Sequence, residues 1–145
     1  MAFHDYEVAL NYAKKINKPL MIDFTGHACV NCRKMEEQVW SDQIVKSILA
    51  NDVVLVSLYV DERINLPEEE QYITTMAGKE KKVKTTGDKW MVFQANTFGT
   101  NSQPYYVMLD LQENQLLEPA NYQDYGSVEL FKEWLQRGVK SFNEI

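Results

Sequence analysis

The segment Val53–Val60 is an almost unbroken apolar run, and it constrains the fold of this 145-residue chain more than any other feature. A strand that is apolar on both faces has to be covered on both sides, which is typical of a central parallel strand in an α/β domain. Leu20–Phe24 is a shorter run of the same kind, and Gly26 ends it. Both runs therefore predict strands of a sheet that is covered on both faces.

Helical patterns lie before, between and after these strands. Apolar residues recur at intervals of three and four in the segments 5–16, 30–40, 41–49 and 127–142. Asp5, the pair Ser41-Asp42, and Ser127 stand at the starts of three of these segments and are residue types that cap helix N-termini. Lys18-Pro19 ends the first segment, because a residue that precedes proline disfavours the helical conformation. This alternation predicts an α/β fold.

Residues 61–89 interrupt the regular order. The stretch contains a cluster of glutamates and then a cluster of lysines, separated by the breakers Pro67, Gly78 and Gly87. We expect a solvated surface insertion that contains some helix, since long loops are usually of that kind. The alternative is that the insertion docks a partner.

The chain returns to regular patterns after the insertion. Trp90 and Phe93 have helical spacing, and Gly99 can provide a left-handed C-terminal cap for that helix. Pro104–Asp110 then predicts another strand. Its hairpin partner is predicted at Gln115–Glu118, across a short polar turn.

The composition fits one globular domain over residues 1–145, with 45% hydrophobic residues. A formal net charge of −6 and a pI near 4.9 argue against a general affinity for nucleic acid or anionic membranes, so a protein partner or a small substrate is expected. The sequence has no apolar run of eighteen or more residues and no signal-peptide pattern. Met1-Ala2 is compatible with a natural start and equally with a soluble domain excised from a membrane protein.

The only two cysteines form the motif Cys29-Val-Asn-Cys32 at the start of a predicted helix. On a helix this spacing puts both sulfurs on one face, at a Cα separation within the roughly 4.4–6.8 Å that a disulfide requires. As a structural staple the bridge would contribute little, because closing so short a ring removes only about 2 kcal/mol of unfolded-state entropy. A functional, reversible disulfide explains the motif better.

Other interpretations of the cysteines are weaker. His27, Cys29 and Cys32 offer three ligands where a structural zinc site needs four, and the chain has no second CxxC, so we expect no metal. Haem attachment is excluded because Arg33 stands where the CxxCH motif needs histidine. Two inert buried cysteines at this spacing are the remaining alternative.

The order of elements and the segment Ile22–Glu36 resemble the thioredoxin superfamily, and most closely the C-terminal thioredoxin-like domain of the DsbD family of thiol:disulfide interchange proteins. The resemblance covers most of the chain. It rests on the CVxC motif, on an acid six residues before Cys29 (Asp23), on an acid seven residues after it (Glu36), and on Ser-Gln-Pro104 before a late strand. It implies a central mixed β-sheet flanked by helices, with the charged insertion before the strand that Pro104 leads. One departure is Ala28, where the superfamily commonly has tryptophan.

The positions of the candidate residues predict their chemistry. Cys29 at the helix N-terminus is the expected nucleophile, because unpaired N–H groups and the helix dipole stabilise a thiolate. Cys32, one turn inside the helix, is the expected resolving thiol. Burial in an apolar strand should raise the pKa of Asp23, which suits a group that accepts the proton of Cys32. Glu36 could share that task or raise the pKa of the thiols, although a solvated surface position and a purely structural Asp23 are the alternatives. We expect a Cys29 pKa between the extremes that these opposing effects would set.

The resemblance also implies how partners are bound. Most X–Pro bonds are trans, but the matching proline of the superfamily is cis and faces the cysteines, so a cis Gln103-Pro104 bond is expected to offer backbone groups to an extended partner segment. His27 and Ala28 flank the motif and are further candidates for substrate contact, although His27 is expected to be an exposed turn residue and not a base.

The resemblance therefore implies a thiol:disulfide oxidoreductase that needs no cofactor beyond the Cys29–Cys32 disulfide. The favoured interpretation is a periplasmic protein-disulfide reductase, which accepts electrons from a membrane-embedded dithiol and passes them to protein disulfides through transient mixed disulfides. An oxidase or isomerase, a redox-inert binding module and a cytoplasmic location are the alternatives. Val30-Asn31 lacks the Gly-Pro of typical thioredoxins, and the sequence does not fix the reduction potential.

Overall fold

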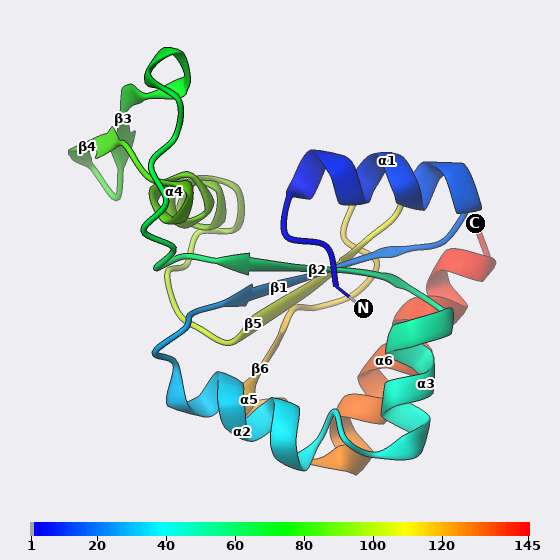
Figure 1. Ribbon diagram of the computed structural model, residues 1–145. Coiled ribbons are helices and arrows are strands. Elements are labelled where there is room, and N and C mark those ends of the chain that lie inside the picture. The colour runs from blue at the N-terminus through cyan, green and yellow to red at the C-terminus, as the bar shows by residue number, and fades with distance from the viewer. Residues whose placement is uncertain (1) are drawn as a thin grey trace.

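The computed structural model of the protein describes residues 2–145 and contains a mixed four-stranded sheet in the order β2-β1-β5-β6 (Figure 1). The strands are β1 (Leu20–Thr25), β2 (Val54–Tyr59), β5 (Tyr105–Leu109) and β6 (Ala120–Asn121). β1 runs parallel to β2 and antiparallel to β5, and β5 runs antiparallel to β6. The mixed sheet that the resemblance implied is confirmed.

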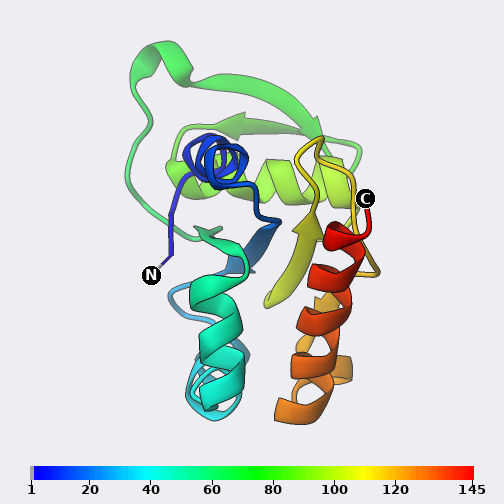
Figure 2. The same ribbon diagram turned by 90° about the vertical axis from the view of Figure 1, so that its right-hand side faces the viewer.

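Helices cover both faces of this sheet. The helices are α1 (Tyr6–Ile16), α2 (Val30–Gln38), α3 (Gln43–Asn51), α4 (Thr86–Phe98), α5 (Tyr122–Tyr125) and α6 (Val128–Asn143). One face carries α1 and α4, and the other carries α2, α3 and α6, with α3 and α6 side by side in Figure 2. Asp5 and Ser127 cap their helices as predicted, and of the predicted pair Ser41-Asp42 it is Asp42 that caps; each of the three accepts a backbone N–H of the helix that follows. Gly99 ends α4 with a φ of 73°, as the sequence predicted.

A hydrophobic core lies on each face of the sheet, and the side chains of β1 point alternately into one core and the other. This alternation positions the site. Leu20, Ile22 and Phe24 pack on the side of α1 and α4, whereas Met21 packs with residues of α2, α3 and α6. Because successive side chains of a strand point to opposite faces, Asp23 shares the face of Met21. The acid is therefore inside the layer between the sheet and α2.

β2 lies at one side of the sheet, so its predicted central position is wrong. Among the named strands it pairs with β1 alone. Its other edge is covered by the N-terminal segment: Phe3 N–H donates to Leu55 O at 2.9 Å, and Ser57 N–H donates to Phe3 O at 2.8 Å. Helices on both faces account for the apolar run, since burial of the two faces does not require neighbouring strands on both edges.

The charged stretch contains a β-hairpin that the sequence patterns did not predict. After a single turn of 3₁₀ helix at Glu68–Glu70, β3 (Tyr72–Met76) pairs antiparallel with β4 (Lys79–Val83), and the hairpin lies beside α4 (Figure 1). Ala77 and Gly78 have φ values of 53° and 79°, as the favoured two-residue hairpin turn requires. The predicted helical content is limited to the 3₁₀ turn and the first residues of α4, which begins at Thr86.

The hairpin partner predicted for β5 at Gln115–Glu118 is also wrong. Only an isolated bridge joins Leu109 to Gln115, and the paired strand is β6, five residues further along. The carbonyl groups of the predicted strand bind α6 instead. Trp134 Nε1–H donates to Glu118 O at 2.8 Å, and Ser141 Oγ–H donates to the O of Leu116 at 3.3 Å.

Across residues 2–145, no helix has the length and apolar character that a bilayer crossing requires.

Candidate active site

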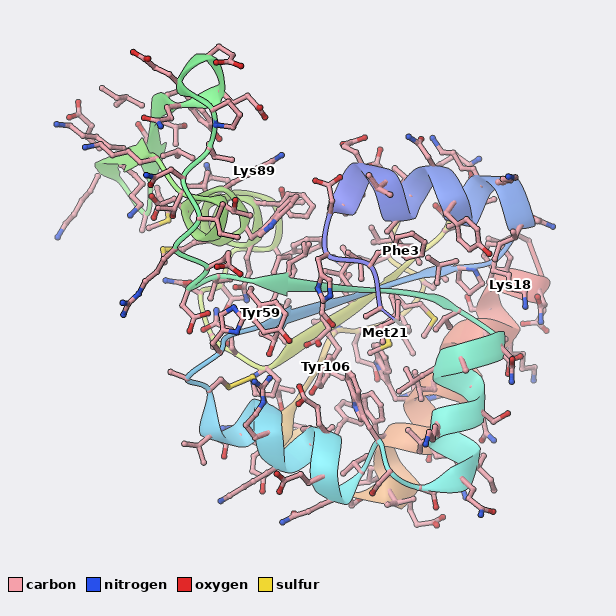
Figure 3. The ribbon with its side chains drawn as sticks, in the orientation of Figure 1. Phe3, Lys18, Met21, Tyr59, Lys89 and Tyr106 are labelled. Atoms are coloured by element: carbon pink, nitrogen blue, oxygen red, sulfur yellow. A yellow bond between two sulfur atoms is a disulfide. The ribbon has the colours of Figure 1, made fainter. Side chains whose placement is uncertain are left out.

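Cys29 and Cys32 are joined in a disulfide at the N-terminus of α2, with their Cα atoms 5.2 Å apart. Figure 3 shows the sulfur–sulfur bond where the chain enters this helix, at the same end of the sheet as Tyr59. Cys29 is the N-cap residue, and its Sγ accepts the N–H of Cys32 at 3.1 Å. Cys29 is partly accessible, whereas Cys32 is only 2% exposed. The two sulfurs are therefore unequal in their access to a partner.

Asp61 holds the loop that leads into Cys29. Its carboxylate accepts the backbone N–H of His27 at 2.8 Å and that of Ala28 at 3.2 Å. Burial would raise the pKa of Asp61, but these backbone hydrogen bonds outweigh it and the pKa is lowered. Gly26 gives the carboxylate room, because a Cβ there would lie 3.3 Å from Asp61 Oδ2. Sequence reasoning placed Asp61 only at the end of a strand, and its proximity to the loop depends on the β1–β2 pairing.

His27 is exposed, as expected, and neighbouring side chains fix its ring. The ring stacks on Tyr59 with centroids 4.1 Å apart, and Nε2 lies 3.1 Å from Glu62 Oε1. His27, Tyr59 and Glu62 line a surface hollow beside the redox loop, together with His4, Ile64 and other residues. Ala28 is exposed. The roles of His27 and Ala28 in substrate binding stay predictions.

Asp23 is buried between the two neighbouring strands, at 2% exposure. Its pairing partners are Ser57 on β2 and Tyr106 on β5, and Ser57 Oγ–H donates to Asp23 Oδ2 at 2.9 Å. Burial raises the pKa of Asp23 to about 7, although the Ser57 hydrogen bond opposes the rise. The predicted direction of the pKa shift is confirmed. An acid of this pKa can gain or lose a proton near neutral pH.

Arg33 pairs with Glu36 and was missed by sequence reasoning, which used it only to exclude haem. Its Nη2–H donates to Glu36 Oε2 at 2.8 Å and to Thr25 Oγ1 at 3.2 Å. Both charged side chains are about one third exposed, at 36% each. The charge of Glu36 raises the pKa of Asp23, whereas that of Arg33 lowers it. Glu36 thus acts on the site as half of an ion pair, not as a free carboxylate.

Replacing Arg33 by glutamine is expected to raise the pKa of Asp23 further, by about one unit, because the cation is lost and Glu36 is left unpaired. The carboxyl carbon shift of Asp23, followed by NMR as a function of pH, measures this pKa. Lys34→Gln is the matched control, since it removes the same charge from an exposed neighbouring position. Equal titration midpoints in the wild type and Arg33→Gln would contradict this account of the site's charges.

Pro104 lies at the end of the sheet from which the redox loop leaves. Its bond to Gln103 is cis, as the resemblance implied. Tyr105 pairs with Phe24, so the next residue outward, Pro104, stands level with Thr25, four residues before Cys29. Pro104 is buried and Gln103 is partly exposed. Their predicted contact with a partner segment is compatible with this position and stays a prediction.

Comparison with known proteins agrees with the fold and the motif. A family model described as thioredoxin-like matches residues 1–111. This chain belongs to the thioredoxin-like family. No curated protein sequence matches it. Its Cys29–Cys32 disulfide gives this thioredoxin-like domain the redox pair of a thiol:disulfide oxidoreductase.

Three solved structures show the same fold at low sequence identity. One, described as DsbH oxidoreductase, has a TM-score of 0.68 and 20% identity, over 97% of this chain and 85% of that one. A thioredoxin from Thermus thermophilus gives 0.64 and 19%, over 94% and 85%. The oxidised C-terminal domain of DsbD from Neisseria meningitidis gives 0.58 and 13%, over 95% and 99%. The thioredoxin-like α/β fold is thus shared along nearly the whole chain.

Proposed function

We propose that this thioredoxin-like domain is a protein-disulfide reductase. In the reduced domain, the thiolate of Cys29 attacks one sulfur of a partner's disulfide, and the other partner sulfur leaves as a thiolate that takes up a proton. Cys32 then loses its proton and attacks the Sγ of Cys29. The partner's second sulfur leaves in turn, so two electrons pass to the partner and the Cys29–Cys32 disulfide forms.

The observation that carries this proposal is the unequal exposure of two bonded cysteines at a helix N-terminus. The partly accessible Cys29 can meet a partner, and its Sγ already accepts the N–H of Cys32, a contact that favours a thiolate. Cys32 is buried, so it can react with Cys29 and not with a second partner. This asymmetry supports the assignment of nucleophile and resolving thiol.

Asp23 supplies a proton acceptor for the second step. It lies on the sheet face that α2 covers, and its pKa near 7 leaves a large fraction ionised at neutral pH. An acid with an ordinary pKa would be a much weaker base toward a thiol. We assign Asp23 to the deprotonation of Cys32, with Glu36 acting through the ion pair that it forms with Arg33.

The electrostatics of the site support reduction over oxidation. A strongly oxidising pair has a stabilised thiolate, usually through a neighbouring cation. Here the residues between the cysteines, Val30 and Asn31, are uncharged, and the guanidinium of Arg33, directly after Cys32, is paired with Glu36. The ionised form of Asp23 further disfavours a thiolate on the same side of the sheet.

The proposal includes partners and location. By its likeness to the C-terminal domain of DsbD, we propose that this domain works in the periplasm and receives its electrons from a membrane-embedded dithiol. Protein disulfides would dock against Gln103 and Pro104 and against the exposed Val30, which is 66% accessible. An apolar side chain beside the reactive sulfur suits contact with a protein surface.

The equilibrium potential of the Cys29–Cys32 couple tests the direction of electron flow. We expect a value near or below about −200 mV when the domain is equilibrated in glutathione buffers of known ratio and the thiols are counted by alkylation and mass spectrometry. A potential near about −120 mV, as in strongly oxidising pairs, would contradict the reductase proposal.

A further inference from the structure

Gln94 is a fully buried polar side chain in the middle of α4, with 0% exposure. Both polar atoms of its carboxamide, Nε2 and Oε1, form hydrogen bonds. Its Nε2–H donates to Ser102 O at 2.8 Å, and its Oε1 accepts the Nε2–H of Gln103 at 2.9 Å. The amide thus binds two consecutive residues of a single segment.

The burial of this amide is costly unless its hydrogen bonds are made, whereas an apolar side chain would fill the same space without that requirement. These two bonds lead outward from α4 to the segment 102–103, and neither is a bond within the helix. The helix itself therefore does not need Gln94. The feature that depends on Gln94 is the conformation of the segment before Pro104.

α4 is a firm support for that segment. Phe93, the neighbour of Gln94, packs on Phe24 and Tyr6 with ring centroids 5.8 and 4.7 Å away. At the start of the helix, Gly87 N–H donates to Glu62 O at 3.0 Å, and a Cβ on Gly87 would lie only 2.6 Å from backbone atoms of Glu62. The helix is thus fixed both to the central strand β1 and to the chain that follows Asp61, the carboxylate that holds the redox loop.

We propose that Gln94 is a positioning residue for the partner-binding segment of this domain. Its carboxamide fixes the carbonyl of Ser102 and the side chain of Gln103, so that the backbone next to Pro104 is held ready for an extended peptide at the level of the redox loop. The inference rests on the proposed function and adds a specificity determinant to it. Peptide disulfides depend on Gln94, because they have a backbone that can bind along the segment, whereas small disulfides do not.

The test compares two disulfides in single-turnover reactions of the pre-reduced protein: insulin, which presents a peptide backbone, and hydroxyethyl disulfide, which has none. Gln94→Met keeps the unbranched shape and removes the amide. Both hydrogen bonds of the amide are lost in this variant. We expect the rate with insulin to fall about tenfold, which corresponds to about one hydrogen bond between the segment and the bound peptide, and the rate with hydroxyethyl disulfide to stay within about twofold. The reduction potential of the Cys29–Cys32 couple should not change.

A second variant and a control separate positioning from general damage. Gln94→Glu keeps an acceptor for Gln103 but loses the amide donor to Ser102, so a selective loss with insulin is expected again. Asn96→Ala is the matched control, because it removes a side-chain to backbone hydrogen bond from the same helix, here to Thr75 O. It should react with both disulfides as the wild type does.

The outcomes are distinct. Equal losses on both disulfides, or unchanged rates on both, in the two Gln94 variants would overturn the positioning role and leave the proposed function intact. A wild-type protein that reduces neither disulfide would overturn the proposed function together with this inference.

Discussion

Replacing Cys29 by serine is expected to reduce disulfide-reductase activity to the uncatalysed background, because the accessible nucleophile is lost and Cys32 is buried. Cys32→Ser is expected to lose turnover as well, but for a different reason. Its Cys29 can still attack a partner, and the reaction then stops because no second thiol resolves the mixed disulfide. Insulin reduction with excess dithiol as the electron source measures turnover in both variants.

The two variants control for each other, since both lose one sulfur of the same pair and both lose the disulfide. Any loss of stability from the missing bridge is common to them and small, about 2 kcal/mol for so short a ring. Substantial turnover in Cys29→Ser would contradict the assignment of the nucleophile. Equal behaviour of the two variants in the first half-reaction would contradict the assigned order of attack.

Asp23→Asn is expected to remove a large pH dependence of stability. The pKa of Asp23 is about 7 in the folded protein, against about 3.9 for an aspartate in an unfolded chain. Between these values the folded state holds a proton that the unfolded state has released. The free energy of unfolding therefore falls as the pH rises from about 4 to about 7, by on the order of 4 kcal/mol from this group alone.

Urea unfolding of the oxidised protein between pH 4 and pH 8 measures this contribution. The wild type should become less stable as the pH rises from about 4 to about 7, and Asp23→Asn should lack this fall and be more stable than the wild type at pH 8. Glu37→Gln, which neutralises an exposed carboxylate on α2, should keep the wild-type profile. A pH profile of Asp23→Asn that parallels the wild type would show that another group causes the dependence.

The elements that the sequence predicted well are those fixed by local patterns. Leu20–Phe24 is a strand because its apolar run needs burial on both faces, and Asp5 and Ser127 start helices because each caps the N–H groups directly after it. The sequence also located the disulfide, since the spacing of Cys29 and Cys32 on a helix brings the sulfurs together.

Elements that depend on distant partners could not be predicted in this way. The hairpin formed by β3 and β4 lacks apolar alternation, because most of its side chains face solvent and Val83 is its one buried residue. The position of β2 at the edge of the named strands is not a local property either. Its outer edge is covered by Phe3, which precedes its bridge partner Val56 by 53 residues. An apolar run reports that both faces are covered and does not report which strands are its neighbours.

The same limit applies to the site. Asp23 and its raised pKa followed from one strand and its apolar neighbours. Asp61, Arg33 and Gln94 were not found, because their roles come from contacts with His27, Glu36 and Gln103 that require the folded chain. A fully buried glutamine is recognisable only once its burial is known.

The capture of a partner on Cys29 tests the central claim most directly. Pre-reduced Cys32→Ser is mixed with a protein whose disulfide is intact, and the products are analysed by intact mass and by peptide mapping without reductant. We predict a one-to-one adduct linked through Cys29 that dithiothreitol reverses, and no such adduct with Cys29→Ser. Failure of Cys32→Ser to form the adduct, or equal adduct formation through Cys32 in Cys29→Ser, would contradict the account.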